Sequence, residues 1–120
     1  MISQPCVFIV DDDDAVRDGL SMVLETIGLA CQVFENAERF LEGYVPGTPG
    51  CLVLDIIMPG MRGDELQVEL IRRNILLPII FVTSHNDTIT ADRTLKAGAV
   101  DYMIKPLQKQ LLIERIQALL

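Results

Sequence analysis

Residues 51–60 read Cys51-Leu-Val-Leu-Asp-Ile-Ile-Met-Pro-Gly60, which is an apolar run, a carboxylate and then a turn. An apolar run without polar alternation predicts a strand that is buried on both faces, as in a parallel sheet covered by helices. The same character recurs at residues 6–10, 30–34, 79–82 and 100–104. We therefore expect five strands, the third of them at residues 51–54.

Segments with helical periodicity fill the intervals between these strands. The clearest helix has apolar residues at Val16, Leu20, Val23, Leu24 and Ile27, with Gly28 as a C-terminal cap. Further helices are expected from Asn36 through Tyr44 and at residues 64–73, 87–97 and 108–120, and the fourth has the weakest apolar stripe. This alternation implies right-handed crossovers and a doubly wound α/β fold, in which functional groups gather at the carboxyl ends of the strands.

The composition is that of one globular domain, which we expect to span residues 1–120. Ten basic residues against 17 acidic ones give a net charge of −7, which disfavours binding of nucleic acid by this domain itself. There is no apolar run of membrane-spanning length and no signal peptide, so we expect a cytoplasmic protein that does not bind a membrane. Cys6, Cys31 and Cys51 lack metal-site spacing and are expected to be buried, reduced thiols.

Carboxylates follow two of the expected strands. Asp11, Asp12, Asp13 and Asp14 come directly after the first strand, and Asp55 comes directly after the third. Asp13 and Asp14 are suited to the start of the next helix, which leaves Asp11 and Asp12 unexplained. Two unit charges about 4 Å apart repel by about 4 kcal/mol at an effective dielectric constant near 20, so the cluster favours a divalent cation. Oxygen ligands favour Mg²⁺ or Mn²⁺.

Polar residues also stand at the ends of the last two strands. Thr83 closes the fourth strand and Lys105 closes the fifth. An acyl-phosphate site needs a carboxylate nucleophile, a cation, an ammonium group and a hydroxyl group around the phosphoryl oxygens. Asp55, Lys105 and Thr83 supply all of these groups except the cation.

Four stretches together resemble the response-regulator receiver domains of two-component systems, over essentially the whole chain. They are Phe8-Ile-Val-Asp-Asp12, Leu54-Asp-Ile-Ile-Met-Pro-Gly60, Thr83-Ser84 and Ala97-Gly-Ala-Val-Asp-Tyr-Met-Ile-Lys-Pro106. The resemblance implies a flavodoxin-like fold, with a five-stranded parallel sheet and five helices, and the function of a phosphorylation-dependent signalling switch. A receiver of this kind is a signalling domain, not an enzyme, although it catalyses its own phosphoryl transfer and dephosphorylation.

The resemblance also implies a role for each polar residue at the strand ends. Asp55 takes the phosphoryl group from a sensor histidine kinase. Asp12, Asp55 and the backbone carbonyl of Ile57 bind Mg²⁺, and Asp11 acts mainly through metal-bound water. Lys105 pairs with the phosphoryl group.

The switch that the resemblance implies consists of two residues. Thr83 turns toward the phosphoryl group, and Tyr102 rotates inward as an aromatic reporter. The Lys105–Pro106 peptide bond is expected to be cis.

The residues around positions 97–106 and His85 are most similar to FixJ-type receivers, which precede a helix-turn-helix output domain. DNA is then bound only through such a domain, which is absent from these residues. His85 is itself expected to be an exposed loop residue. Phosphorylation is expected to promote homodimerisation through the fourth helix and fifth strand, on a face with Leu95, Ala99, Val100 and either Leu111 or Leu112.

Three other functions fit parts of the sequence. A haloacid-dehalogenase-type phosphatase also uses an Asp-x-Asp motif after its first strand, but Ala15 stands where that motif has Thr or Val, and there is no cap domain. A receiver that no longer accepts phosphate is disfavoured because all the strand-end residues are present. A flavodoxin-like flavin binder needs a loop rich in Gly, Ser and Thr where this chain has aspartates.

Overall fold

The computed structural model describes residues 4–120, in which strands and helices alternate strictly. The strands are β1 (Cys6–Val10), β2 (Ala30–Phe34), β3 (Gly50–Leu54), β4 (Ile79–Thr83) and β5 (Asp101–Ile104). The helices are α1 (Asp14–Thr26), α2 (Ala37–Gly43), α3 (Gly63–Arg72), α4 (Thr88–Lys96) and α5 (Lys109–Leu119). Within residues 4–120, no helix is long and apolar enough to cross a membrane.

The five strands form one parallel sheet in the order β2-β1-β3-β4-β5, which confirms the predicted doubly wound fold. The register pairs Val10 with Leu54, so β1 and β3 end at the same level. Thr83 pairs with Ile104 in the same way at the ends of β4 and β5. The residues that end or follow these four strands therefore meet at one edge of the sheet.

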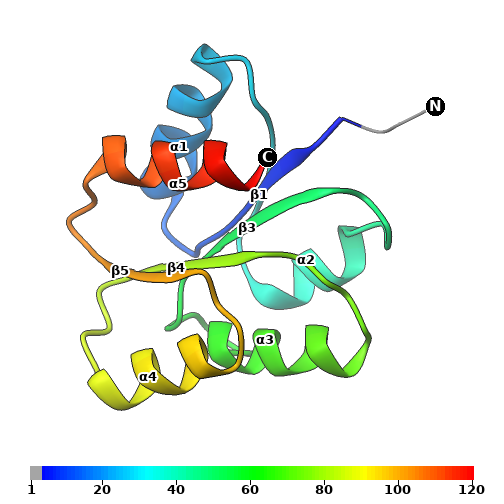
Figure 1. The fold of residues 1–120 in the computed structure, drawn as a ribbon, viewed down its shortest axis with the longest axis vertical. Coiled ribbons are helices and arrows are strands. Elements are labelled where there is room, and N and C mark those ends of the chain that lie inside the picture. The colour runs from blue at the N-terminus through cyan, green and yellow to red at the C-terminus, as the bar shows by residue number, and fades with distance from the viewer. Residues whose placement is uncertain (1–3) are drawn as a thin grey trace.

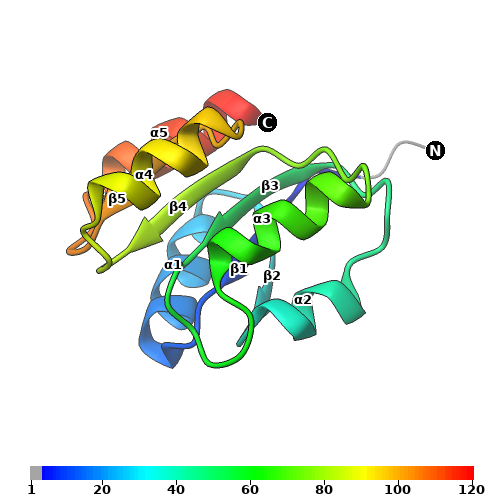
Figure 2. The ribbon, with the colours of Figure 1, turned by 90° about the horizontal axis from the view of Figure 1, so that it is seen from below.

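Helices cover the sheet on both sides. Figure 1 shows α1 and α5 on one face and α2, α3 and α4 on the other, and Figure 2 shows the second group from below. Successive strand residues point to opposite faces, so Phe8 and Leu52 pack beneath α2 and α3 while Ile9 and Val53 pack beneath α1 and α5. This double burial is the reason why the central strands are apolar throughout.

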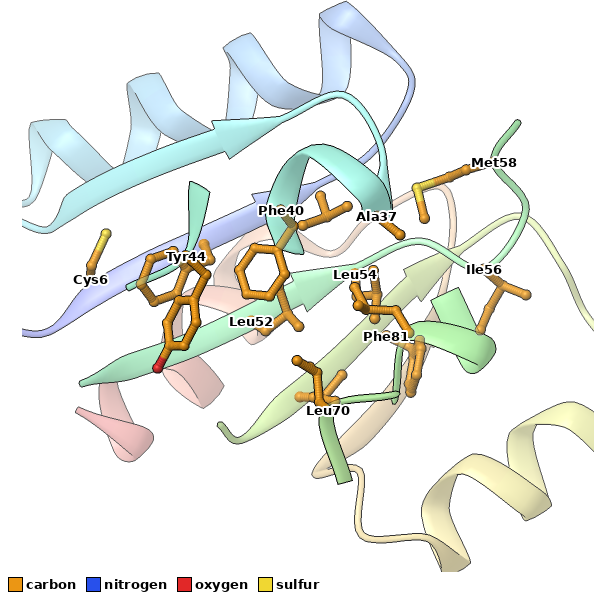
Figure 3. Packing of buried hydrophobic residues seen from close by; sticks show 14 residues of the cluster. Cys6, Ala37, Phe40, Tyr44, Leu52, Leu54, Ile56, Met58, Leu70 and Phe81 are labelled. Atoms are coloured by element: carbon orange, nitrogen blue, oxygen red, sulfur yellow. The ribbon is translucent and has the colours of Figure 1, made fainter. Parts of the chain in front are cut away.

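Aromatic rings organise the core beneath α2 and α3 (Figure 3). Phe40 of α2 stacks on Tyr44 with the ring centroids 5.2 Å apart, and it meets Phe8 edge-on at 5.8 Å. The Tyr44 hydroxyl donates a hydrogen bond to the carbonyl oxygen of Thr48 over 2.9 Å. Such ring pairs contribute about 0.5–1.5 kcal/mol each beyond area burial, so the short helix α2 is firmly attached to the sheet.

Side-chain caps fix where two of the helices begin. The Asp13 carboxylate accepts a hydrogen bond from the amide of Ala15 at the start of α1, and the Asn36 side chain accepts one from the amide of Arg39 in α2. Both caps were expected from the sequence. Because α1 begins at Asp14 and Asp13 is its cap, Asp11 and Asp12 remain outside the helix.

The last helix buries Leu112 and Ile116 in the core beneath α1 and α5. Leu112 is only 1% exposed, so the prediction that it could lie on a dimer face is wrong. Leu112 and Ile116 are four residues apart and share one side of the helix, and this side faces the sheet. Leu111 is half-buried and remains a candidate for the dimer face.

Helix α4 is attached to the molecule mainly through polar groups. Its buried residues are Thr90 and Thr94, whereas its apolar residues Ile89 and Leu95 are 75% and 41% exposed. The side-chain nitrogen of Gln67 in α3 donates to the carbonyl oxygen of Thr94 over 2.9 Å. The weak apolar stripe predicted for the fourth helix is therefore confirmed.

An ion pair also links α3 to α4. The buried carboxylate of Asp64 in α3 accepts hydrogen bonds from Arg62 Nε at 3.0 Å and from Arg93 Nη2 of α4 at 2.8 Å. Burial raises the pKa of Asp64, but the two arginines outweigh burial and hold the pKa below its ordinary value. Asp64 is therefore ionised at neutral pH and connects the two helices electrostatically.

The three cysteines are free, with Cys6 and Cys51 buried and Cys31 half-buried. Burial raises the pKa to about 11 for Cys31 and to about 12 for Cys51. Both therefore remain thiols at neutral pH, which is the unreactive form.

We predict that Asp64→Asn lowers the free energy of unfolding by about 1–2 kcal/mol at pH 7, since it weakens two charge-assisted hydrogen bonds to partly exposed arginines. Because the folded-state pKa of Asp64 is lowered, its contribution is complete above the ordinary aspartate pKa and is lost as the pH falls through the lowered value. The difference between the variant and the unaltered protein should thus shrink below about pH 4, as measured by urea unfolding. The control Asp92→Asn breaks the exposed pair with Lys96 and should cost less than about 0.5 kcal/mol. Equal losses in the two variants would contradict the prediction.

Candidate functional site

Side chains from four strand ends meet at the carboxyl edge of the sheet. Asp11 follows β1, Asp55 follows β3, Thr83 ends β4 and Lys105 follows β5. An open pocket of about 610 Å³ is lined by Asp11, Asp12, Asp13, Asp55, Ile57, Thr83, Ser84, His85 and Lys105. The pocket thus brings together the residues predicted for the site, except Tyr102 and Pro106. Tyr102 contacts the lining residue His85, and Pro106 directly follows Lys105 in the chain.

The backbone fixes the position of Asp55. Its amide donates to the carbonyl oxygen of Val10 over 3.0 Å, and its Oδ1 accepts from the amide of Ile56 over 2.7 Å. Gly63, the first residue of α3, packs against the same segment, and its amide donates to the carbonyl oxygen of Ile56 over 2.8 Å. A Cβ atom at Gly63 would lie 1.8 Å from the carbonyl oxygen of Asp55, so this position requires glycine.

Lys105 supplies positive charge to the pocket. Its Nζ lies 2.8 Å from Asp11 Oδ2 and 3.3 Å from Asp55 Oδ2. Burial lowers the pKa of Lys105, but the hydrogen bond to Asp11 and the charges of both aspartates outweigh burial and raise the pKa. Lys105 is therefore charged at neutral pH and offsets part of the repulsion between the carboxylates. The Lys105–Pro106 peptide bond is cis, which is the geometry that the family resemblance implies.

Asp11 lies deeper in the pocket than its neighbour Asp12, which is exposed. Burial raises the pKa of Asp11, and the charge of Asp55 adds to this effect, although the hydrogen bonds from Lys105 and from the amide of Asp13 oppose it. A guanidinium nitrogen of Arg17 donates to the carbonyl oxygen of Asp11 over 2.6 Å. The raised pKa means that burial, together with the charge of Asp55, destabilises the ionised form of Asp11.

Asp11, Asp12 and Asp55 form a candidate metal site. Each offers a carboxylate oxygen, and these oxygens all lie within 4.8 Å of one another. Carboxylate oxygens are the ligands that hard divalent cations prefer, and Lys105 alone does not balance three negative charges. The residues present therefore fit a bound divalent cation.

The two residues predicted for the switch are connected through one loop residue. The Thr83 hydroxyl oxygen accepts a hydrogen bond from the amide of His85 over 3.0 Å, and the Tyr102 hydroxyl donates to the carbonyl oxygen of His85 over 2.6 Å. The ring of Tyr102 packs against Phe81 with the centroids 5.9 Å apart. His85 is half-buried, so the prediction of an exposed loop residue is wrong. The reason is that both backbone polar groups of His85 bond to neighbouring strand residues.

A family model described as the response regulator receiver domain matches residues 7–117 of this chain. The chain belongs to this family. Nodulation protein W of Bradyrhizobium diazoefficiens is 40% identical over 112 residues, which are 93% of this chain and 49% of that protein. The transcriptional regulatory protein FixJ of Azorhizobium caulinodans is also 40% identical over 112 residues, which are 93% of this chain and 53% of that protein.

Solved structures of receivers have the same fold. The response regulator StyR matches with a TM-score of 0.92 at 43% identity, over 98% of this chain and 60% of that one. The FixJ-N crystal structure matches with a TM-score of 0.86 at 38% identity, over 97% of this chain and 93% of that one. This receiver is therefore a signalling module of the two-component type, and it spans about half the length of the curated relatives that it matches.

Two residues that shape the site were missed by the sequence analysis. Arg17 contacts the backbone of Asp11, but this contact depends on how α1 turns away from the strand, and no local pattern indicates it. Gly63 had a usable signal, since a glycine directly before a predicted helix indicates a close backbone approach.

We predict that Gly63→Ala lowers the free energy of unfolding by about 3 kcal/mol, because the added methyl group overlaps the backbone of the segment that carries Asp55. The matched control is Gly19→Ala in the interior of α1, where a Cβ atom meets nothing within 4 Å. The control should raise stability by about 0.5–1 kcal/mol through helix propensity. Urea unfolding measures both effects, and a Gly63→Ala variant as stable as the unaltered protein would contradict the packing described here.

Proposed function

We propose that this receiver accepts a phosphoryl group on Asp55 from a sensor histidine kinase, with bound Mg²⁺, and controls a transcriptional output domain. The observation that carries the proposal is the placement of Lys105 Nζ between Asp11 and Asp55, beside the three carboxylates that fit a cation. Mn²⁺ satisfies the same oxygen ligands. We further propose that residues 1–120 constitute the receiver domain.

The proposed reaction is a phosphoryl transfer between two protein groups. A carboxylate oxygen of Asp55 attacks phosphorus, the bond from phosphorus to the kinase imidazole breaks, and the electron pair of that bond returns to the imidazole nitrogen. In the proposed reaction, Lys105 pairs with one phosphoryl oxygen, and the Thr83 hydroxyl donates a hydrogen bond to another. Asp12, Asp55 and the carbonyl oxygen of Ile57 would hold Mg²⁺, with Asp11 acting through water, and the cation would supply charge neutralisation.

Dephosphorylation completes the proposed cycle. Water attacks phosphorus of the acyl phosphate, and the carboxylate of Asp55 is regenerated with release of inorganic phosphate. The pocket is open to solvent at Ile57, which is 49% exposed, so water reaches the phosphoryl group directly. The domain thereby catalyses both steps on itself and remains a signalling domain.

The proposed switch runs from Thr83 to Tyr102 and α4. A phosphoryl oxygen accepts a hydrogen bond from the Thr83 hydroxyl, whose oxygen now accepts one from the amide of His85, so a shift of Thr83 toward the phosphoryl group displaces His85. Any movement of His85 changes the position of Tyr102, because the Tyr102 hydroxyl donates a hydrogen bond to the carbonyl oxygen of His85. The loop continues directly into α4, whose attachment is mainly polar and therefore adjustable at low cost.

The proposed output is transcriptional and operates through parts of a longer protein. Several relatives are transcriptional regulatory proteins by name, and this chain matches about half of their length. The net charge of −7 makes direct contact with DNA by the receiver unfavourable, so DNA binding is assigned to an output domain. The kinase, by contrast, must reach Asp55 through the open pocket.

Homodimerisation on phosphorylation is proposed for the face formed by α4 and β5. Leu95 and Val100 are each 41% exposed there, and Leu111 of α5 is half-buried. Ala99 is partly buried against the core and contributes less. An apolar face of this limited size favours a reversible dimer over a permanent one.

We predict that acetyl phosphate and Mg²⁺ add one phosphoryl group to the protein, as measured by intact mass. Asp55→Asn should abolish the addition, because the amide is not a nucleophile, and EDTA should abolish it because three close carboxylates repel a phosphoryl anion. Asp12→Ala should lower the rate at least about tenfold at limiting Mg²⁺. A phosphoryl group on Asp11, or labelling that persists in EDTA, would refute the site assignment.

We predict that beryllofluoride, an acyl-phosphate mimic, tightens self-association at least about tenfold, or ~1.4 kcal/mol, in sedimentation velocity. Leu95→Glu should prevent this change by placing a charge on the dimer face. The control Val68→Glu alters an exposed apolar residue of α3 and should leave dimerisation intact. A monomer at high concentration with beryllofluoride bound would exclude the dimer, and a dimer that persists in Thr83→Ala would exclude the proposed route.

A further inference from the structure

The loop between β3 and α3 contains a hydrogen bond that the proposed function does not use. The carboxylate of Glu38, in the first turn of α2, accepts a hydrogen bond from the backbone amide of Met61 over 2.9 Å. The two residues are 23 positions apart in the chain. Figure 2 shows this loop beside the start of α2, and Figure 3 shows its residue Met58 next to Ala37.

The neighbouring amide in the loop is held in the same manner from another helix. The amide of Arg62 donates to Glu65 Oε1 of α3 over 2.8 Å. Two consecutive loop amides, at Met61 and Arg62, are therefore bonded to glutamates of two different helices. The local contact to Glu65 is a capping arrangement of α3, whereas the contact to Glu38 joins the loop to a separate element.

Gly60 brings the loop close enough for this contact. It has a φ of 80°, and a Cβ atom at this position would lie 2.5 Å from Glu38 Oε2. Glycine is therefore favoured at this position by the left-handed backbone, and the absence of a Cβ atom leaves room for the close approach of the carboxylate. The packing of Gly60 and the hydrogen bond to Met61 are separate observations that place the Glu38 carboxylate against the loop.

The loop connects this contact to the phosphorylation pocket. Its first residues are Asp55 and Ile56, which are buried, and Ile57, which lines the pocket. Met58 is buried again, so the loop is anchored near its start. Between Met58 and the helix, the side chain of Met61 packs against the core, and the hydrogen bond to Glu38 joins the Met61 backbone to α2, which is itself held by Phe40 in the aromatic core.

We infer that Glu38 is a positioning residue for the phosphorylation site, which holds the turn at residues 59–61 and thereby fixes the backbone of Ile57 for cation binding. The inference rests on the proposed role of the Ile57 carbonyl as a metal ligand. Glu38 itself touches neither the cation nor the phosphoryl group, and it acts through the loop backbone.

Glu38→Ala should expose the Met61 amide and weaken cation binding. A charge-assisted hydrogen bond at a solvent-accessible position corresponds to about a threefold to tenfold effect, so we expect Met61 to exchange its amide hydrogen faster by this factor, measured by NMR. The dissociation constant for Mg²⁺, measured by calorimetry without any phosphoryl donor, should rise by a similar factor. The adjacent Arg62 amide should exchange its hydrogen at an unchanged rate in Glu38→Ala. In Glu65→Ala, the Arg62 amide should exchange faster and the Met61 amide should be unchanged.

Two further variants separate the hydrogen bond from charge and from general stability. Glu42→Ala removes a carboxylate from the same helix that pairs with Arg39 and does not contact the loop, so it should change neither Met61 nor Mg²⁺ binding. Glu38→Gln keeps an acceptor oxygen and should remain within about threefold of the unaltered protein in both measurements. The free energy of unfolding of each variant is measured in urea. A purely structural effect would lower stability without changing Met61 exchange and Mg²⁺ binding together.

Faster exchange at Met61 together with weaker Mg²⁺ binding in Glu38→Ala, restored in Glu38→Gln and absent in Glu42→Ala, supports the inference. Unchanged exchange at Met61, unchanged Mg²⁺ affinity despite an exposed Met61, or a Glu38→Gln variant as impaired as Glu38→Ala overturns it. An unaltered protein that binds no Mg²⁺ refutes the proposed function instead, and the exchange of Met61 then still decides whether Glu38 holds the loop.

Discussion

The repulsion between Asp11 and Asp55 is the constraint on which the rest of this receiver depends. Both carboxylates are buried at adjacent strand ends, because Val10 and Leu54 are paired in the sheet. Lys105 relieves part of the repulsion through contacts to both. A pocket of this kind is stabilised by added positive charge, which is why the proposed phosphorylation of Asp55 includes a cation.

The surrounding helices are attached to the sheet in unequal ways. Helices α1, α2, α3 and α5 each bury apolar side chains in one of the two cores, whereas α4 buries threonines and is linked to α3 through Gln67 and Asp64. Polar attachments can be exchanged for other polar contacts with little loss of free energy, but apolar packing cannot. A rigid sheet that carries one adjustable helix suits a signalling module, since a local change in charge can shift one element and leave the fold intact.

Most of the fold was predictable because local patterns and global packing agree. The apolar runs fixed the strands to within one residue, and Asp13 and Asn36 marked helix starts where the structure has them. The errors concern side-chain direction. Leu112 faces the core and His85 is half-buried, and each depends on how a helix or loop lies on its neighbours, which periodicity alone does not specify.

The sequence by itself determined that Asp11, Asp55, Thr83 and Lys105 belong to one site, because parallel strands place their carboxyl ends at one edge whatever the details of packing. Only the tertiary structure decided which groups support that site. The contact of Glu38 with the loop after β3 joins residues far apart in the chain, and it exists only because α2 packs beside that loop. Such contacts follow from the relative placement of whole elements, and no local sequence pattern encodes that placement.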